Sequence, residues 1–380
     1  MRVLILSVTA GFGHHATAKA IGDMLTSKGA EVQTLDVYAY ISNLIKNTID
    51  KGYLFSSKHM QTLYRLVYQL AENNGAGYFS NAPSIINIIN ALGASKFAKV
   101  LAGYAPDVIL CTHIFAAQMV DELKKRKKLD DIVTIGIVTD YTLHPYWEDV
   151  PRVQYIITAS ELLTYRCVKR GIPERRILPL GIPVHPKFNQ HLSREDAAAQ
   201  LGIDPHMRTI LLMGGSMGYA DHVKTLEKLT GIGLPLQLLV VCGNNKKMLL
   251  RVEQFASRYE GSCVVKTYGF VHNVEVMMSA SDCIVSKPGG LTVSEALAKN
   301  LPMLLVDPIP GHEERNVEFL VNNGMAALIT KHFPIDEAVY ELFRNPVRLQ
   351  TVRQTMQAVA HPDATERLAE FVLHQQEKPQ

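Results

Sequence analysis

Residues 283–297 read CIVSKPGGLTVSEAL, and this stretch decides the fold class. Four residues suited to a buried strand lead through two glycines into a helix that we expect to begin near Leu291 and Thr292. Glycines at such a junction end the strand and leave the first backbone N–H groups of the helix open to an anion. A strand, a glycine turn and a helix in this order indicate an α/β protein with a parallel sheet.

The same alternation continues along most of the chain. Apolar runs predict further strands at Val3–Val8, Glu31–Leu35, Val108–Cys111, Ile132–Val138, Tyr155–Thr158, Thr209–Met213, Leu236–Cys242, Cys263–Thr267 and Met303–Val306. The stretch GIPVHPKF at residues 181–188 carries two prolines and is the expected linker. We therefore predict two doubly wound domains, residues 1–185 and residues 186–380, and leave open that the last helix returns to the first domain.

The composition narrows the class of protein. Of the 380 residues, 47% are hydrophobic and 20% are charged, which is typical of a soluble globular protein. The net charge of +3 at pH 7 does not indicate a nucleic-acid partner, although it permits attraction to an anionic membrane surface. The five cysteines form no CxxC pair and lie mostly in or beside apolar runs, so we expect buried thiols in a reducing compartment.

Membrane contact is expected to be peripheral. No apolar run reaches the roughly 18 residues of a membrane span, and the opening run MRVLILSV is too short for a signal peptide. We therefore expect a cytoplasmic location. Residues 38–104 interrupt the strand pattern, because apolar side chains recur there at helical spacing, for example from Met60 to Ala71. Either a helical pair packs on the domain, or these residues form a surface at a membrane boundary.

Two further features of the first half have plain explanations beside functional ones. The basic run at residues 124–128 closes a helix, where the helix dipole favours cations, so we interpret it as a solvated helix end. The glycine loop at residues 11–16 reads GFGHHA and, with Asp36 some 20 residues later, fits the dinucleotide pattern GxGxxG/A. Taken alone, this loop favours a nicotinamide or flavin enzyme.

The histidine pair in the same loop argues for a different chemistry. His14 and His15 stand at a helix start, where a pyrophosphate would need close backbone approach. The helix dipole tends to keep a histidine there neutral, and a neutral imidazole is what a general base requires. We predict His14 as the base, with His15 in that role or a histidine that only caps the helix as alternatives. Gly13 and His15 are expected on the acceptor side.

Polar residues that follow two other strands are expected in the same region. Asp140 follows the strand at residues 132–138, and we predict it as a second catalytic residue that orients His14 or binds substrate hydroxyls. His113, His144 and Trp147 are expected to join it on the acceptor side. These histidines show no HxxxH or HExxH spacing, so we predict no metal.

The second half carries loops suited to a nucleoside diphosphate. One follows the strand at residues 209–213 and consists of Gly214, Gly215, Ser216 and Met217, where backbone N–H groups and a hydroxyl can approach a phosphate. The other is the opening stretch, with Lys287, Gly289 and Gly290 before the helix and Glu295 one turn into it, where its carboxylate can accept bonds from ribose hydroxyls. A capping box of Thr292 and Glu295 is the alternative explanation of their spacing.

A third loop reads PIPGHEERN at residues 308–316. Two prolines and a glycine fix this loop beside the previous one. We predict that His312, Glu313 and Asn316 bind sugar hydroxyls, whereas Glu314 and Arg315 are ordinary surface charges.

The motifs KPGGLTVSEAL, PIPGHEERN, GGSMG and GFGHH together resemble those of glycosyltransferase family 28. The likeness spans nearly the whole chain and points to the monogalactosyldiacylglycerol synthases and the bacterial processive diacylglycerol glucosyltransferases. It implies a GT-B fold, in which two Rossmann-like domains face each other across a cleft. It also implies that residues 1–185 serve the acceptor and the membrane and that residues 186–380 bind the UDP-sugar donor.

Single residue roles follow from the same resemblance. His14 matches the family's base, and Glu295 matches its ribose ligand. Leu291 and Thr292 match the phosphate-binding turn, the backbone of Phe270 and Val271 meets the uracil, and the hexose is read by His312 and Glu313. The peptidoglycan lipid II synthase, which shares the donor half, usually carries glutamines at these last two positions, and this departure favours a glycolipid enzyme.

The sequence therefore predicts an inverting, metal-independent glycosyltransferase without a cofactor. It would move glucose or galactose from UDP-glucose or UDP-galactose to diacylglycerol and give a β-glycolipid at an anionic membrane surface, with no nucleic-acid partner. The alternatives are a transferase with another lipid acceptor, a nicotinamide-dependent oxidoreductase, a nucleotide-sugar epimerase, and a nucleotide-sugar binding protein without turnover.

Overall fold

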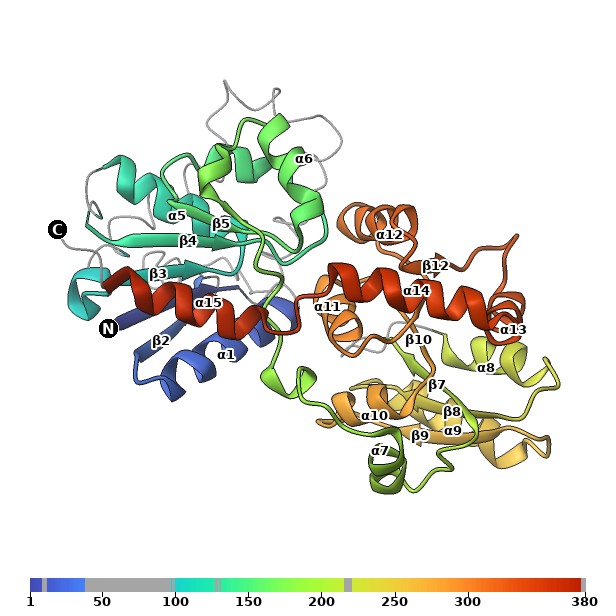
Figure 1. Ribbon diagram of the computed structural model, residues 1–380. Helices are drawn as coiled ribbons and strands as arrows, with labels where there is room; N and C mark the ends of the chain where they lie inside the picture. The colour runs from blue at the N-terminus through green and yellow to red at the C-terminus, as the bar shows by residue number, and fades with distance from the viewer. Residues whose placement is uncertain are drawn as a thin grey trace, which may run out of the picture. The chain divides into compact units, whose positions relative to one another are not determined.

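The computed structural model of the protein describes residues 1–8, 12–37, 97, 100–126, 129, 131–214 and 221–376. They form two compact units, one of Met1–His185 with Asp363–Gln380 and one of Pro186–Pro362 (Figure 1). The last helix, α15 (Ala364–Leu373), thus belongs to the first unit. Its apolar side chains share a core with those of the first strand and the first helix.

Six parallel strands form the sheet of the first unit, in the order β2-β1-β3-β4-β5-β6. They are β1 (Arg2–Ser7), β2 (Glu31–Asp36), β3 (Val108–Cys111), β4 (Val133–Ile137), β5 (Tyr155–Ile157) and β6 (Ile177–Leu178). The strands β1, β3 and β4 are almost wholly buried, as apolar runs in a parallel sheet with covered faces require. The chain leaves β1 for β2 on one side and later reaches β3 on the other, so the strand order reverses between β1 and β3.

Helices cover this sheet. They include α1 (Phe12–Ser27), α5 (Ile114–Lys125) and α6 (Thr164–Lys169). Figure 1 shows α1 and α15 side by side, and the two helices are in contact. In an open parallel sheet, ligands bind at the carboxyl ends of the strands where the order reverses. In this unit that position is shared by the ends of β1 and β3.

Six parallel strands also form the sheet of the second unit, in the order β12-β11-β10-β7-β8-β9. They are β7 (Arg208–Met213), β8 (Leu236–Val241), β9 (Val264–Tyr268), β10 (Cys283–Ser286), β11 (Met303–Leu305) and β12 (Ala326–Leu328). Counted within the unit, this is the 3-2-1-4-5-6 order of dinucleotide-binding folds. The order reverses between β7 and β10, and both predicted phosphate loops follow these two strands.

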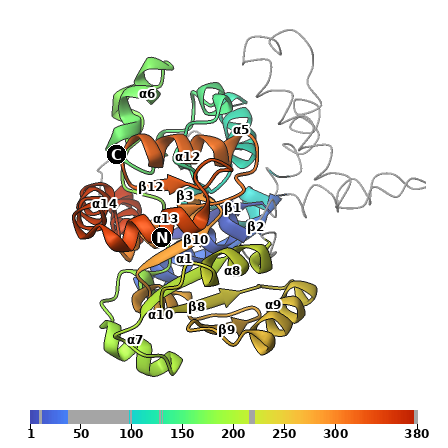
Figure 2. The same cartoon turned by 90° about the vertical axis from the view of Figure 1, so that its right-hand side faces the viewer.

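The helices of the second unit pack on both faces of its sheet. They include α7 (Arg194–Leu201), α8 (His222–Thr230), α9 (Lys246–Arg258), α10 (Val274–Ala280), α11 (Gly290–Ala298), α12 (His312–Asn322), α13 (Ile335–Arg344) and α14 (Pro346–Val359). Figure 2 shows α9 alongside β9, the outer strand with which it packs. The buried side chains of β7, β8 and β10 form the core with those of α8 and α13.

The α/β prediction is confirmed, and every strand predicted from the sequence is present with ends that shift by at most one residue. The strands β6 and β12 were not predicted from the sequence. The helical pattern at residues 38–104 lies almost wholly outside the described residues, as do Lys127 and Lys128 of the basic run. The described part of that run ends α5, where the Lys124 ammonium donates to the Ile132 carbonyl over 2.8 Å.

All five cysteines are buried, as the sequence predicted. Burial raises the pKa of the Cys111 and Cys283 thiols well above the usual range, which makes them poor nucleophiles. None of the helices in the described ranges combines the length and the apolar character of a membrane span.

Candidate active site

The side chain of His14 is held at the reversal point of the first sheet. It lies in the first turn of α1, and its Nδ1 atom is 2.8 Å from the backbone carbonyl oxygen of Thr112, the residue after β3. The hydroxyl oxygen of Thr139, two residues after β4, is 3.1 Å from the same nitrogen. A carbonyl oxygen only accepts, so Nδ1 carries the proton. In the neutral ring, the lone pair is therefore on Nε2, as a general base requires.

A second histidine packs against this ring. His113 caps the start of α5, where its Nδ1 accepts from the backbone N–H of Phe115 over 3.1 Å. Its neutral ring therefore carries the proton on Nε2, opposite to the tautomer of His14. The two ring centroids are 4.7 Å apart and the ring planes are nearly perpendicular. The structure thus brings together two of the predicted residues in complementary tautomers.

His15 points to a different partner from that of His14. Its Nε2 lies 3.5 Å from a carboxylate oxygen of Asp36, at the end of β2. Asp36 occupies the position of the ribose-binding carboxylate in a dinucleotide enzyme, so this contact competes with that use. Gly13 lies partly buried in the first turn of α1, and Gly11 is outside the described residues.

The remaining residues predicted on the acceptor side differ in burial and in their contacts. Asp140 is partly buried directly after Thr139, whose hydroxyl is the side chain that contacts His14. His144 is buried, and its Nδ1 accepts from the backbone N–H of Tyr146 over 3.3 Å, so it caps a short helix. Trp147 is only 4% exposed and packs over Gly136, where an added Cβ would lie 2.4 Å from its ring. The ring is thus part of the core, and a contact between Trp147 and the acceptor stays a prediction.

The second unit presents an uncapped helix start at its own reversal point. The helix α11 begins at Gly290, and Gly289 is the N-cap residue, which has no side chain to bond the first N–H groups. The start of a helix without such a cap favours an anion. The proposed capping box is wrong, because Thr292 and Glu295 are the third and sixth residues of the helix. Lys287 is partly buried at the end of β10.

The loop after β7 is only partly described. Gly214 is buried directly after the strand, whereas Gly215, Ser216 and Met217 lie outside the described residues. Since β7 and β10 are neighbours, Gly214 and Lys287 follow adjacent strand ends.

Glu295 has an unusual electrostatic environment. Its side chain is partly buried, and burial raises the pKa of the carboxyl to about 8. The ammonium of Lys187 lowers this pKa, whereas the nearby Glu275 carboxylate raises it further. Lys187 and Glu275 form an ion pair of 2.7 Å. The carboxyl of Glu295 is therefore poised between its neutral and charged forms near neutral pH.

Side chains of α12 tie the third loop to the second. One carboxylate oxygen of Glu313 accepts from the backbone N–H of Ile309 over 2.7 Å, and the Asn316 amide donates to the Pro288 carbonyl over 2.9 Å. Asn316 is fully buried, and its bond to Pro288 connects the two loops; its predicted contact with sugar hydroxyls stays a prediction. Glu314 accepts from the Gly311 backbone over 3.0 Å and caps α12, rather than being an ordinary surface charge. His312 is partly buried at the helix start.

The loop after β9 offers an aromatic face. The Phe270 side chain is 49% exposed and contacts the His272 ring edge to face, with 5.0 Å between the centroids. Val271 is partly buried between them. The Lys187 ammonium donates to the His272 carbonyl over 2.5 Å, which connects this loop to the residues around Glu295.

Several residues of the site were not predicted from sequence. The Thr112 carbonyl fixes the tautomer of His14, the Thr139 hydroxyl contacts the same ring nitrogen, and Lys187 and Glu275 set the charge around Glu295. Their position is the one signal in the sequence: each threonine lies near the end of a strand and directly precedes a predicted residue, His113 or Asp140. Across the described ranges, no three histidine, cysteine or acidic side chains converge as a metal site would require.

Two doubly wound units of this kind define the GT-B fold, and solved structures agree. A MurG structure from Acinetobacter baumannii matches with a TM-score of 0.67 at 17% identity, over 98% of this chain and 99% of that chain. A UDP-GlcNAc 2-epimerase from Neisseria meningitidis, bound to UDP-GlcNAc, matches with a TM-score of 0.58 at 14% identity, over 98% and 100% of the two chains. These likenesses establish the fold and no more, since a transferase and an epimerase share it.

Sequence comparisons identify the family. Residues 14–184 match the model of monogalactosyldiacylglycerol synthase, and residues 209–368 match the glycosyltransferase family 28 C-terminal domain. The chain is 30% identical to the chloroplastic monogalactosyldiacylglycerol synthase of Spinacia oleracea, over 96% of this chain and 70% of that protein. It is also 26% identical to a processive diacylglycerol beta-glucosyltransferase of Bacillus pumilus, over 98% of this chain and 95% of that protein. The chain belongs to glycosyltransferase family 28, in the group of the monogalactosyldiacylglycerol synthases.

Proposed function

We propose that the protein transfers a hexose from a UDP-sugar to the free hydroxyl of diacylglycerol. The observation that carries this proposal is the contact of 2.8 Å between His14 Nδ1 and the Thr112 carbonyl, since it places the proton on Nδ1 and the basic lone pair on Nε2. The names of the relatives supply the acceptor class. The relative from Bacillus pumilus is named as a diacylglycerol glucosyltransferase, and the relative from Spinacia oleracea as a monogalactosyldiacylglycerol synthase.

The proposed reaction divides between the two units. In the first unit, His14 Nε2 removes the proton from the acceptor hydroxyl as its oxygen attacks the anomeric carbon of the sugar. The bond from that carbon to the diphosphate breaks, UDP leaves with the electron pair, and the configuration inverts to a β-linkage. In the second unit, the uncapped start of α11 at Gly290 stabilises the charge on the leaving diphosphate. Asp140 is proposed to bind the acceptor or to support His14.

The donor is proposed to be UDP-glucose or UDP-galactose. Relatives named for glucose and for galactose transfer match at similar identity, so the choice between the two hexoses rests with experiment. His312 and Glu313 are proposed to read the hexose, and Glu313 is already fixed by its bond to Ile309. Glu295 is proposed to bind the ribose, Leu291 and Thr292 the phosphates, and the backbone of Phe270 and Val271 the uracil.

A surface suited to an anionic membrane lies on α6 and the turn before it. Leu162, Tyr165 and Val168 are 51%, 78% and 42% exposed and recur at intervals of three residues. Arg166 and Lys169 are exposed beside them. Apolar side chains flanked by cations are typical of surfaces that enter the headgroup region. We propose that this stripe contributes to peripheral membrane association.

Vesicle binding tests this part of the proposal. Replacing Tyr165 and Val168 by serine should lower sedimentation with vesicles that contain anionic lipid, and high salt should weaken the binding of the wild type. Val347→Ser is the control, because Val347 is an apolar residue of α14 that is 72% exposed. Equal sedimentation of all variants would exclude α6 from the membrane surface.

One assay tests the proposed activity. The protein is incubated with labelled UDP-glucose or UDP-galactose and diacylglycerol vesicles, and the lipid products are identified. Labelled glycolipid, with release of UDP, supports the proposal, and EDTA should leave the rate unchanged if the reaction needs no metal. An altered nucleotide sugar without a lipid product would instead indicate an epimerase. A thermal shift with NAD rather than UDP would indicate an oxidoreductase, and binding without turnover would indicate a sensor.

A further inference from the structure

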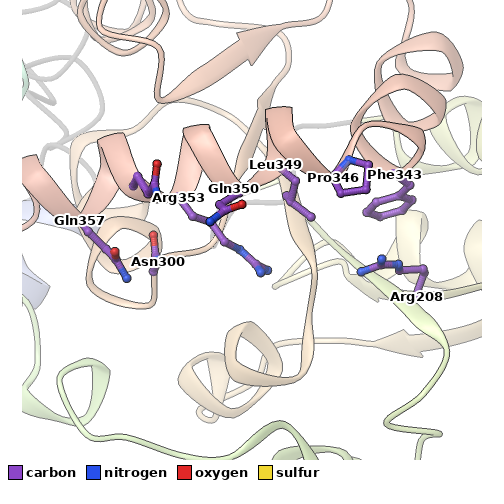
Figure 3. Close-up of a pocket in the computed structure, with 9 residues that line it drawn as sticks. Arg208, Asn300, Phe343, Pro346, Leu349, Gln350, Arg353 and Gln357 are labelled. Atoms are coloured by element: carbon purple, nitrogen blue, oxygen red, sulfur yellow. The ribbon is translucent and has the colours of Figure 1, made fainter.

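A polar pocket of about 370 Å³ lies in the second unit, near the start of β7 and thus at the opposite end of this strand from the donor loop (Figure 3). Its walls include Arg208 at the start of β7 and Asn300, which follows the C-terminal end of α11. The donor loops instead follow the end of β7 and precede the start of α11. One face of α14 forms the rest of the wall with Gln350, Arg353, Gln354 and Gln357.

The pocket carries an excess of positive charge. Two of its lining residues are arginines and none is acidic. Arg208 donates to Asp282 over 2.7 Å, but the same carboxylate also receives Arg194 over 3.0 Å, so one negative charge serves two guanidinium groups. Arg353 forms no ion pair with the described residues, and its buried Nε has no hydrogen-bond partner among them. The second positive charge of the pocket is thus unbalanced.

The pocket also offers groups that match hydroxyls. The side-chain oxygen of Asn300 is buried and accepts no hydrogen bond within the described part of the chain. Gln350, Gln354 and Gln357 stand at positions i, i+4 and i+7 of α14, so their amides point from one helix face. Amides both donate and accept, as recognition of a hydroxyl requires. Buried polar groups without partners are costly, which favours a ligand that satisfies them.

We propose that this pocket is a second small-molecule site, which binds a phosphorylated polyol. The phosphate lies between Arg208 and Arg353, whose guanidinium groups enter the same space from β7 and α14 in Figure 3. Planar guanidinium groups match phosphate oxygens in pairs, and the adjacent amides bind the hydroxyls. The site is separate from the donor site and does not depend on the proposed transfer activity.

A comparison of two arginine variants tests the proposal. Glycerol 3-phosphate is titrated into the full-length protein and binding is followed by calorimetry and by thermal unfolding. At about ten times the dissociation constant, binding should raise the Tm by roughly 3–6 °C. Arg353→Gln should weaken the affinity about 10- to 100-fold, since it removes a charged hydrogen-bond donor pair. Arg348→Gln is the matched control, because Arg348 lies on the same helix but pairs with Glu341 outside the pocket.

The remaining outcomes decide the proposal as well. Equal binding by the wild type and Arg353→Gln would place the phosphate elsewhere, for example at the start of α11, and would overturn the site. Arg353→Lys, which keeps the charge and is less disruptive, should bind more tightly than Arg353→Gln; equally weak binding by these two variants with an unchanged fold would show that charge at this position does not hold the phosphate, and would overturn the site. Inorganic phosphate that binds as tightly as glycerol 3-phosphate would overturn recognition of the polyol. Absence of any binding would overturn the whole proposal.

Discussion

The two helices that start at the reversal points of the two sheets offer different groups to a ligand. At the start of α1, the ring of His14 is fixed from two other strand ends by the Thr112 carbonyl and the Thr139 hydroxyl. At the start of α11, Gly289 and Gly290 have no side chains, and the helix is left uncapped. Proton transfer needs one nitrogen in one tautomer, whereas anion binding needs only N–H groups and space. The same topology therefore supports a chemical role in one unit and a binding role in the other.

Loss of His14 should have the largest effect and should affect turnover alone. We expect His14→Ala to lower kcat by roughly 10² to 10⁴, as loss of a general base does, with UDP affinity nearly unchanged. The measurements are the glycolipid assay and UDP calorimetry. His206→Ala, which changes an exposed histidine of the second unit, is the control. If His14→Ala kept its turnover, His14 would not be the base, and the two helix starts would no longer be assigned different roles.

Loss of Glu295 should affect donor binding, which the comparison assigns to the second unit. We expect Glu295→Ala to weaken UDP affinity about 10- to 100-fold, because a charged acceptor for ribose hydroxyls is lost. At saturating donor, kcat should change much less. Glu318→Ala, on the exposed face of α12, is the matched control. A fall in kcat at saturating donor, without a change in affinity, would contradict the binding role.

The raised pKa of Glu295 predicts how donor affinity varies with pH. The carboxyl titrates at about 8 in the free protein, and bonds from ribose hydroxyls favour its charged form. Binding below pH 8 then releases a proton, so affinity for a UDP-hexose should fall by up to about tenfold per pH unit as the pH is lowered from 8 toward 6. Glu295→Gln should flatten this dependence. A wild-type affinity that is constant over the same range would show that the bound carboxyl stays neutral.

The same pKa has a consequence for folding stability. Since the folded protein holds the proton of Glu295 up to about pH 8 and the unfolded chain releases it near 4.5, the folded state binds more protons between these values. The free energy of unfolding should therefore decrease as the pH rises through this window. Thermal unfolding from pH 5 to 8 measures it, with Glu295→Gln as the reference. A difference between the two proteins that does not grow with pH would contradict the raised pKa.

The sequence predicted the local structure from β10 into α11 but not the contacts that hold His14, for a physical reason. The run KPGGLTVSEAL contains the strand end, the glycine turn and the helix within a few residues, so its local structure could be read directly. His14 is held by Thr112 and Thr139, which are 98 and 125 positions away, and no local pattern encodes those contacts. No local pattern encodes the packing of Trp147 either, because the space over Gly136 that accommodates its ring exists only once β4 has formed.

Loss of the Thr139 hydroxyl should have the smallest effect and gives the sharpest test of how His14 is positioned. Thr139→Val keeps the shape of the side chain but removes one of the two contacts to Nδ1, while the Thr112 carbonyl remains. We expect kcat to fall about 2- to 10-fold, with the KM for the donor unchanged, since one hydrogen bond is lost. Thr139→Ser keeps the hydroxyl and should restore the rate. If Thr139→Val kept the full rate and Thr139→Ser were slow with an unchanged Tm, packing of the methyl group rather than the hydrogen bond would position the ring.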